Sequence, residues 1–86
     1  MEVVFLRQAH KFIKKADKPL KEKIKQEILF IVDNPKSGTL LTNIKNVRSH
    51  KFIFKKTHYR IAYTIENNLI IISVASRENF YRDLKI

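Results

Sequence analysis

The segment 46–66, NVRSHKFIFKKTHYRIAYTIE, alternates between apolar and polar residues in two runs with a pair of lysines between them. Successive side chains of a β-strand point to opposite faces of a sheet, so such alternation predicts half-buried strands. In the first run Phe52 and Phe54 share one face, and Lys51 points to the other. The second run places four apolar residues on one face: Tyr59, Ile61, Tyr63 and Ile65. The segment therefore predicts a two-stranded ribbon that turns near residues 56–58, with one apolar and one polar face.

Positive charge gathers along this ribbon. Between residues 48 and 60 the basic residues are Arg48, Lys51, Lys55, Lys56 and Arg60, and the first acid after them is Glu66. The whole chain of 86 residues has a formal net charge of +10. A surface of this kind favours a polyanionic partner, and a sheet face rich in Lys and Arg suits phosphate groups.

The residues before the ribbon predict a strand and two helices. The run EVVFL, rich in β-branched and aromatic residues, predicts a strand over 2–6. Apolar residues at helical spacing predict helices over 7–16 and 19–32, with Pro19 in the first turn of the second helix and Pro35 after its end. The expected buried stripe of the second helix consists of Leu20, Ile24, Ile28, Ile31 and Val32.

The residues after the second helix complete the sheet. Residues 36–45 form a connection whose Leu40, Leu41 and Ile44 are expected to contact the core. After a turn at residues 67–68, the nearly continuous apolar run LIIISVA predicts a strand over 69–75 that is covered on both faces. Residues 80–86 are expected to form a last short helix or a tail packed over the end of the sheet.

This order of elements predicts a single α+β domain over residues 1–86: strand, helix, helix, three strands, then the short C-terminal helix or tail. A chain of this length supports one modest core. Helices that precede the strands are typical of a mainly antiparallel sheet with both helices on one face. The opposite face is expected to be open and to carry the ribbon's cations.

Composition narrows the kinds of site. The chain has no cysteine, which excludes disulfides and thiolate metal sites. Its three histidines lack acidic neighbours at ligand spacing, so neither a metal site nor a cofactor is expected. No apolar run reaches the length of a bilayer-spanning helix, and we expect a cytoplasmic protein that does not enter the membrane.

Beyond these patterns, the chain resembles the RelE/ParE superfamily of toxins from type II toxin–antitoxin systems, and within it the RelE-type branch. The resemblance is carried by the two early helices, the Asn-Pro pair after the second, and the segments GTLLTNIKNVRSHKF, YRIAYTI and ISVASRENFYRDL. It covers nearly the whole chain. It implies an endoribonuclease, an mRNA interferase, that cleaves ribosome-bound mRNA without a metal through attack of the ribose 2′-OH on the phosphodiester.

The resemblance also implies roles for individual residues. Four positions match the family's catalytic set, the last being a tyrosine that stacks on a nucleobase: Lys51, Arg60, Arg77 and Tyr81. Ile53 stands where well-known members carry a second lysine, which leaves two reserve catalytic candidates: His58 and Lys55. Three further basic residues are expected to bind RNA: Arg48, Lys56 and Arg82.

The chemistry of metal-free RNA cleavage explains why these residue types are needed. The site must remove the 2′-OH proton, stabilise charge on the phosphorus oxygens and protonate the leaving 5′ oxygen. Arg60 and Arg77 present planar forks that fit phosphate oxygens. Lys51 is the expected base, and His58 is the reserve because imidazole exchanges protons near neutral pH.

Two other functions stay open at this point. ParE-type chains of the same superfamily are non-enzymatic inhibitors of a topoisomerase, and charge alone fits an inactive nucleic-acid-binding domain. Every toxin hypothesis implies a cognate acidic antitoxin and a toxin–antitoxin hetero-oligomer. The RelE-type hypothesis adds mRNA and the ribosome as partners.

Overall fold

The computed structural model describes residues 1–80 and has an α+β fold. Seven elements follow one another along the chain: β1 (Val3–Phe5), α1 (Arg7–Lys15), α2 (Lys18–Asp33), β2 (Thr39–Leu40), β3 (Arg48–Phe54), β4 (Thr57–Glu66) and β5 (Asn68–Ser76). The predicted order of helices and of the main strands is confirmed. The predicted role of residues 81–86 lies outside the described residues.

The five strands form one mixed sheet in the order β1-β5-β4-β3-β2. The first strand pairs with β5 in parallel, and every other pair is antiparallel. The short strand β2 was not predicted, because its two residues lie in a segment without alternation. Beyond the two β3 residues that pair with β2, Arg48 and Ser49, the rest of β3 forms an edge of the sheet that is free within residues 1–80.

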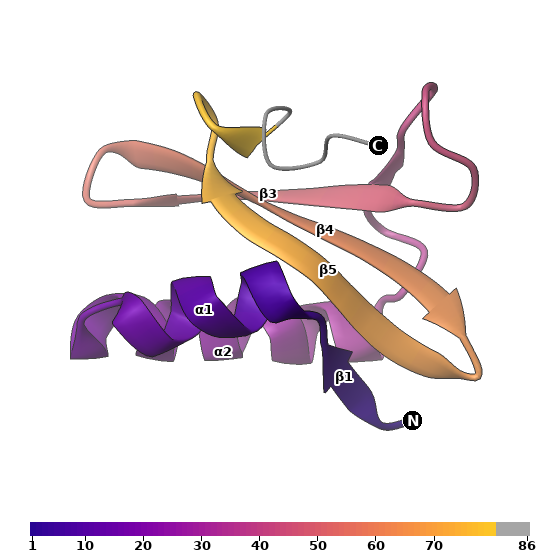
Figure 1. Ribbon diagram of the computed structural model, residues 1–86, viewed down its shortest axis with the longest axis horizontal. Helices are drawn as coiled ribbons and strands as arrows, with labels where there is room; N and C mark the ends of the chain where they lie inside the picture. Colours follow the sequence, from indigo (N-terminus) through magenta and orange to yellow (C-terminus); the bar gives the residue numbers. More distant parts are fainter. Residues whose placement is uncertain (81–86) are drawn as a thin grey trace.

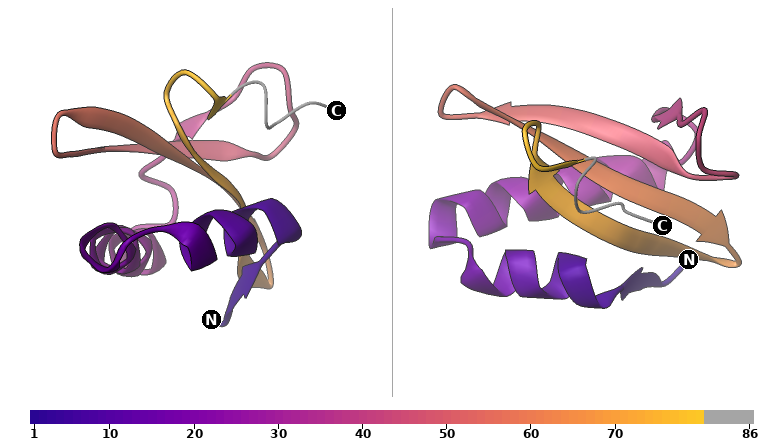
Figure 2. Two further views of the ribbon diagram at one scale, coloured as in Figure 1. Left: turned by 60° about the vertical axis from the view of Figure 1, so that its left-hand side comes forward. Right: turned by 45° about the horizontal axis from the view of Figure 1, so that its top comes forward.

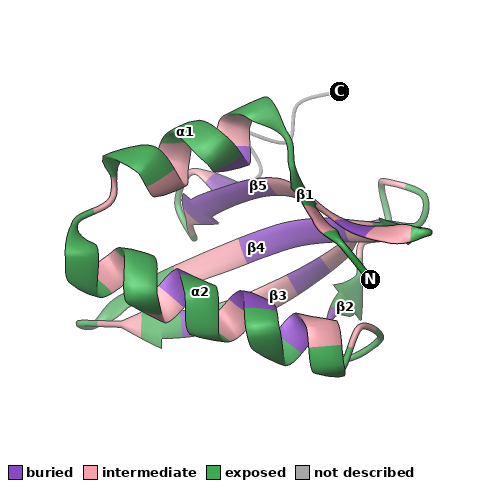
Figure 3. Cartoon of the chain, turned by 90° about the horizontal axis from the view of Figure 1, so that it is seen from below, coloured by how far each residue is buried: buried purple, intermediate pink, exposed green. Residues whose placement is uncertain are grey.

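Both helices cover the same face of the sheet, which we call the helix-side face (Figures 1 and 3). The second helix begins at Lys18, one residue before the predicted start, and the side chain of Asp17 caps it by accepting a hydrogen bond from the Leu20 N–H at 3.0 Å. Ala9 of α1 and Ile24, Ile28 and Ile31 of α2 are buried against the sheet. The larger hydrophobic core therefore lies between the helices and the helix-side face.

The β3–β4 hairpin has the two predicted faces. The rings of Phe52 and Tyr59 stack at 5.3 Å on the helix side, while Lys51 is exposed on the other side. The turn comes slightly earlier than predicted, at Lys55 and Lys56, whose φ angles are 48° and 67°. This left-handed conformation costs a residue with a side chain about 1 kcal/mol or more, so the geometry of the turn does not favour lysine at either position.

A β-bulge in β5 decides which residues reach the second face of the sheet. Ala62 pairs with Ser73, but the next residue, Tyr63, pairs with Ile71, so Ile72 is an extra residue in β5. Side chains before the bulge and after it therefore alternate out of step. Arg77 continues the pairing beyond β5 through its hydrogen bond to the His58 carbonyl and so takes the face opposite the helices. Unbroken alternation from Ile71, without a bulge, would place it on the helix-side face.

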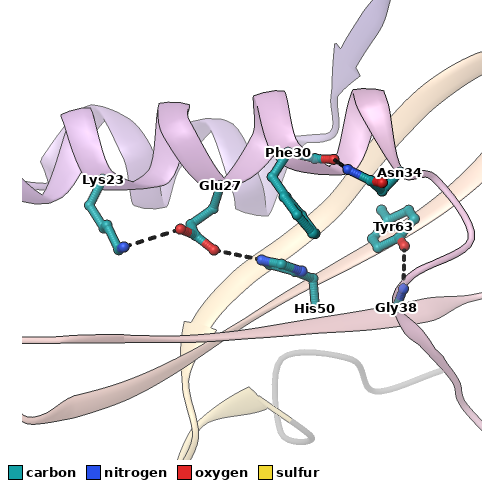
Figure 4. Close-up of polar contacts among 7 residues, drawn as sticks. All are labelled: Lys23, Glu27, Phe30, Asn34, Gly38, His50 and Tyr63. Atoms are coloured by element: carbon teal, nitrogen blue, oxygen red, sulfur yellow. Dashed lines mark hydrogen bonds and ion pairs between the residues drawn. The ribbon is translucent and has the colours of Figure 1, made fainter.

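The connection between α2 and β3 is fixed to the sheet by Tyr63. The hydroxyl of this buried residue accepts a hydrogen bond from the Gly38 N–H at 3.0 Å (Figure 4). It also donates one to the Pro35 carbonyl at 2.8 Å. A Cβ at Gly38 would lie 2.6 Å from that hydroxyl oxygen. Glycine is needed here because of the close approach.

The face opposite the helices, which we call the far face, is only partly open. A second, smaller hydrophobic cluster covers one end of it, formed by Val47, Ala62, Ala75 and Phe80 with Leu41, Ile44 and Ile72 at its margin. Figure 2 shows the covering segments on the side of the sheet away from the helices. The expectation of a wholly open face is therefore wrong at this end. The predicted core contact of Leu40 is also wrong, since Leu40 is 53% exposed.

Candidate functional site

The other end of the far face, which we call the uncovered end because no other segment of residues 1–80 covers it, carries two cross-strand rows of side chains. In the first row Lys51 of β3 pairs with Arg60 of β4. In the second row Ile53 pairs with His58, and the N–H of Arg77 donates to the His58 carbonyl at 2.8 Å. Paired residues share a face and the rows are two residues apart, about 7 Å along the strand. The structure thus brings together Lys51, Arg60, Arg77 and His58, which the sequence had suggested separately.

Within residues 1–80, the cations of these rows have no acidic partner. Lys51 and Arg77 are exposed, and within residues 1–80 neither side chain makes an ion pair or hydrogen bond. Arg60 is half-buried: its Nη1 lies 3.5 Å from the Ser49 hydroxyl, and its guanidinium carbon lies 5.7 Å from the centre of the Phe80 ring. Like charges directly opposite each other destabilise a sheet, so Lys51 beside Arg60 is an arrangement that an anion would relieve.

A hollow of about 650 Å³, which we call the first hollow, is formed around these rows. Its wall includes Lys51, His58, Arg60 and Arg77, and it extends past the free edge of β3 to Lys23 and Glu27 of α2. This volume falls in the range typical of small-ligand sites. The hollow can therefore hold a nucleotide-sized anion against the four side chains from β3, β4 and the end of β5.

A second hollow of about 700 Å³ adjoins the first toward the hairpin turn. It is lined by Lys56, Thr57, His58, Ser76, Arg77 and Glu78. The two hollows share His58 and Arg77, so these two residues stand at the border between them.

Three of the predicted residues are not part of the first hollow. Arg48 alternates in step with Phe52 and lies on the helix-side face, where its Nη1 donates to the carbonyls of Lys36 at 3.1 Å and Gly38 at 2.7 Å. The structure gives Arg48 a bracing role, and the alternation itself was a signal for this.

The two turn lysines also lie outside the first hollow. Lys55 holds its ammonium 5.4 Å from the centre of the Phe54 ring, and Lys56 lines only the second hollow. Tyr81 and Arg82 lie outside the described residues, so their roles stay predictions.

An ionic group on the helix side was missed by the sequence analysis. His50 Nε2 lies 2.7 Å from Glu27 Oε1, and Lys23 Nζ lies 3.1 Å from Glu27 Oε2 (Figure 4). Burial raises the pKa of Glu27, but the hydrogen bonds from His50 and Lys23 outweigh it and leave that pKa below its ordinary value. The visible signals were the Lys23–Glu27 spacing of four and the position of His50 in step with Phe52.

Two findings concern what the described part of the chain lacks. Residues 1–80 contain no group of three or more His, Cys, Asp or Glu side chains placed to hold a metal ion. Neither α1 nor α2, the helices of that region, is long and apolar enough to cross a membrane.

Comparisons with known proteins agree with the predicted resemblance. A family model described as "ParE-like toxin of type II bacterial toxin-antitoxin system" matches residues 3–85. The fold is similar to that of one chain in the crystal structure of the intact E. coli RelBE toxin–antitoxin complex, with a TM-score of 0.71 and 19% identity over 86% of this chain and 93% of that one. No curated protein matches the sequence.

Proposed function

The chain belongs to the family of ParE-like toxins of type II bacterial toxin–antitoxin systems, and on this premise we propose that its toxic activity is the cleavage of mRNA. One observation carries the proposal: Lys51 and Arg60 lie directly opposite each other, in one hollow with Arg77 and His58, and no acid pairs with them within residues 1–80. A phosphodiester is the anion whose cleavage these residue types support. The similarity in fold to a chain of the RelBE complex agrees with it.

The reaction that fits this site is attack of a ribose 2′-OH on the adjacent phosphorus. The bond from phosphorus to O2′ forms while the bond from phosphorus to the 5′ oxygen breaks, which leaves a 2′,3′-cyclic phosphate and a 5′-OH. We assign the non-bridging phosphate oxygens to the guanidinium groups of Arg60 and Arg77, because developing negative charge there is the main obstacle to reaction. Both groups keep their charge throughout.

Two side chains of the first hollow can carry the protons. Lys51, which matches a position of the family's catalytic set, is the first candidate for removing the proton from the 2′-OH. His58 stands at the border of the hollow, within the row next to Lys51, and is the second candidate for taking this proton or delivering one to the leaving oxygen. The variants Lys51→Ala and His58→Gln distinguish them: the proton carrier is the residue whose loss lowers the cleavage rate while RNA binding is retained.

The test of the proposal is a map of new 5′-OH ends in cellular mRNA after induction of the toxin. We expect cuts inside translated codons, and we expect Arg60→Ala and Arg77→Ala to reduce cleavage about 100-fold or more. The variants Arg60→Lys and Arg77→Lys keep the charge but lose the fork, so they should recover only part of the rate. Lys14→Ala, an exposed residue of α1, serves as the control. Full toxicity of both alanine variants would contradict this site.

A second function is favoured by the description of the matching family model as ParE-like. A topoisomerase inhibitor on this fold would act through protein contact and leave transcripts whole. The same induction experiment separates the two functions: damaged DNA with intact mRNA supports the inhibitor, and cut mRNA with intact DNA supports the ribonuclease. In either case we propose that the toxin is neutralised by an antitoxin.

The antitoxin is expected to be acidic, since the chain it must cover has a formal net charge of +10. We expect its gene next to this one, and we expect the two proteins to copurify as a hetero-oligomer whose stability falls with added salt. A complex that forms equally well at high salt would show that apolar contacts, rather than charge, dominate. mRNA and the ribosome are the remaining proposed partners.

A further inference from the structure

We propose that the second hollow is a subsite for the nucleotide next to the one that is cut, with Lys56 as its phosphate contact. This inference rests on the proposed RNA-cleaving function. Its starting point is that the two hollows meet at His58 and Arg77, whose backbones are hydrogen-bonded to each other. A polynucleotide held in the first hollow therefore leaves it past these two residues and enters the second.

The positive charges continue along the hairpin in the same direction. Lys51 and Arg60 form the first row, Arg77 lies beside the second, and Lys56 follows in the turn. An RNA strand laid along the hairpin would meet one basic position after another, as proteins that bind single strands commonly provide. Thr57 and Ser76 also line the second hollow, one from each of the two paired strands.

The conformation of the turn supports a role for Lys56 beyond the fold. Both central residues of this two-residue turn have positive φ, a position that Asn and Gly occupy without strain. Lys56 has a φ of 67° and lines the second hollow, whereas Lys55 has a φ of 48° and lines neither hollow. Strain that serves no packing purpose points to a function for the side chain.

Glu78 determines how the nucleotide is seated. It is the one acidic residue that lines the second hollow within the described part of the chain. A carboxylate repels phosphate and acts only as a hydrogen-bond acceptor, so the phosphate lies toward Lys56 and the base toward Glu78. Adenine, cytosine and guanine carry an exocyclic amino group that can donate to it, whereas the one donor on the pairing edge of uracil, N3–H, lies between two carbonyl oxygens that a carboxylate repels. The subsite is therefore expected to disfavour uridine.

The phosphate contact is tested by binding of 2′-O-methyl RNA oligonucleotides, which cannot be cut because the attacking hydroxyl is blocked. Lys56→Asn and Lys55→Asn form a matched pair, since both remove one charge and both place a residue tolerant of positive φ in the turn. Lys56→Asn should weaken binding about three- to fivefold and reduce the magnitude of the salt slope by about one. Lys55→Asn should lose less, and Lys14→Ala should match the wild type.

The base contact is tested by comparing the sequences around cut sites. The wild type should show few uridines at one position flanking the cut, and Glu78→Gln should restore them, because an amide can also donate a hydrogen bond. Equal salt slopes for Lys56→Asn and Lys55→Asn, or an unchanged uridine frequency in Glu78→Gln, would overturn the subsite while leaving cleavage itself intact. Absence of cleavage by the wild type would instead overturn the proposed function, and the oligonucleotide binding would still report on the hollow.

Discussion

The two faces of the sheet differ in what surrounds their cationic side chains. On the helix-side face, Lys23 and His50 share the carboxylate of Glu27, and the guanidinium of Arg48 is bound by two backbone carbonyls. On the far face, Lys51 and Arg77 are exposed and, within residues 1–80, have no ion pair. The first arrangement supports the fold, whereas the second adds charge repulsion to it.

This difference indicates a division of labour between the faces. The buried side chains of the helix side supply the larger hydrophobic core, and the exposed cations of the far face have no ion pair within residues 1–80, which leaves them available to the RNA that we propose. Substitutions on the helix side should therefore change stability, and substitutions at the uncovered end of the far face should change activity. Neighbouring residues of one strand, which point to opposite faces, offer the sharpest comparison.

The largest expected effect comes from the neighbours Phe52 and Lys51 in β3. Phe52 is 7% exposed and stacks on Tyr59, so Phe52→Ala should lower the free energy of unfolding by about 3–5 kcal/mol. Lys51→Ala should change it by less than about 0.5 kcal/mol, because the side chain is exposed. Urea denaturation followed by circular dichroism measures both values. If the two variants lost similar stability, the division between the faces would not hold.

A somewhat smaller effect is expected at Gly38, where the helix-side face meets the connection to β3. A methyl group there would crowd the Tyr63 hydroxyl at 2.6 Å and the Ser49 carbonyl at 3.1 Å, so Gly38→Ala should cost about 1–3 kcal/mol. Ser37→Ala, its exposed neighbour, is the control. In a double-mutant cycle, Tyr63→Phe should relieve part of the cost because the closest atom is removed. If the free-energy changes of Gly38→Ala and Tyr63→Phe were strictly additive, the methyl group at residue 38 would be crowded by atoms other than the Tyr63 hydroxyl.

The sequence predicted correctly those elements that have one buried face and one face exposed to solvent. The helices and the β3–β4 hairpin were predicted because polar residues marked their outer sides, and the family resemblance is confirmed by the matching family model. In β5 the run LIIISVA is apolar on both faces, so the sequence shows no break in alternation at the extra residue, Ile72. The direction of Arg77 depends on that residue and could not be derived from periodicity.

The second hydrophobic cluster could not be derived either, because it joins residues from three separate segments. Leu41, Ile44 and Val47 come from the connection before β3, Ala62 and Ala75 from neighbouring strands, and Phe80 from beyond β5. None of these segments has a periodic pattern that identifies its partner. Arg48 is the opposite case, since its alternation with Phe52 already placed it on the apolar face.

A third prediction concerns the acid that compensates charge on the helix side. The pKa of Glu27 is lowered in the folded state, so its contribution to stability is complete above the unfolded value and is lost as pH falls through the folded one. Glu27→Gln should therefore cost about 1 kcal/mol near neutral pH, and this cost should shrink as pH falls below the ordinary pKa of a glutamate and through the lowered pKa of Glu27. Glu22→Gln, on the exposed side of α2, should show little change at any pH. A cost for Glu27→Gln that did not vary with pH would mean that shape, and not charge, holds this contact.

The smallest expected effect is a gain in stability at the bulge, where the patterns of the two faces fall out of step. Ser73 is 1% exposed, and its hydroxyl has no hydrogen-bond partner within the described residues. Removing an unpaired buried hydroxyl removes a desolvation cost, so Ser73→Ala should raise the free energy of unfolding by about 0.5–1 kcal/mol. Ser49→Ala is the matched comparison, because that buried serine contacts Arg60 at 3.5 Å and should gain nothing. Since Ile72 remains in place, the extra residue and the direction of Arg77 should persist, and cleavage by Ser73→Ala should equal that of the wild type. A stabilised variant with impaired cleavage would show instead that Ser73 itself helps to shape the bulge that turns Arg77 toward the far face.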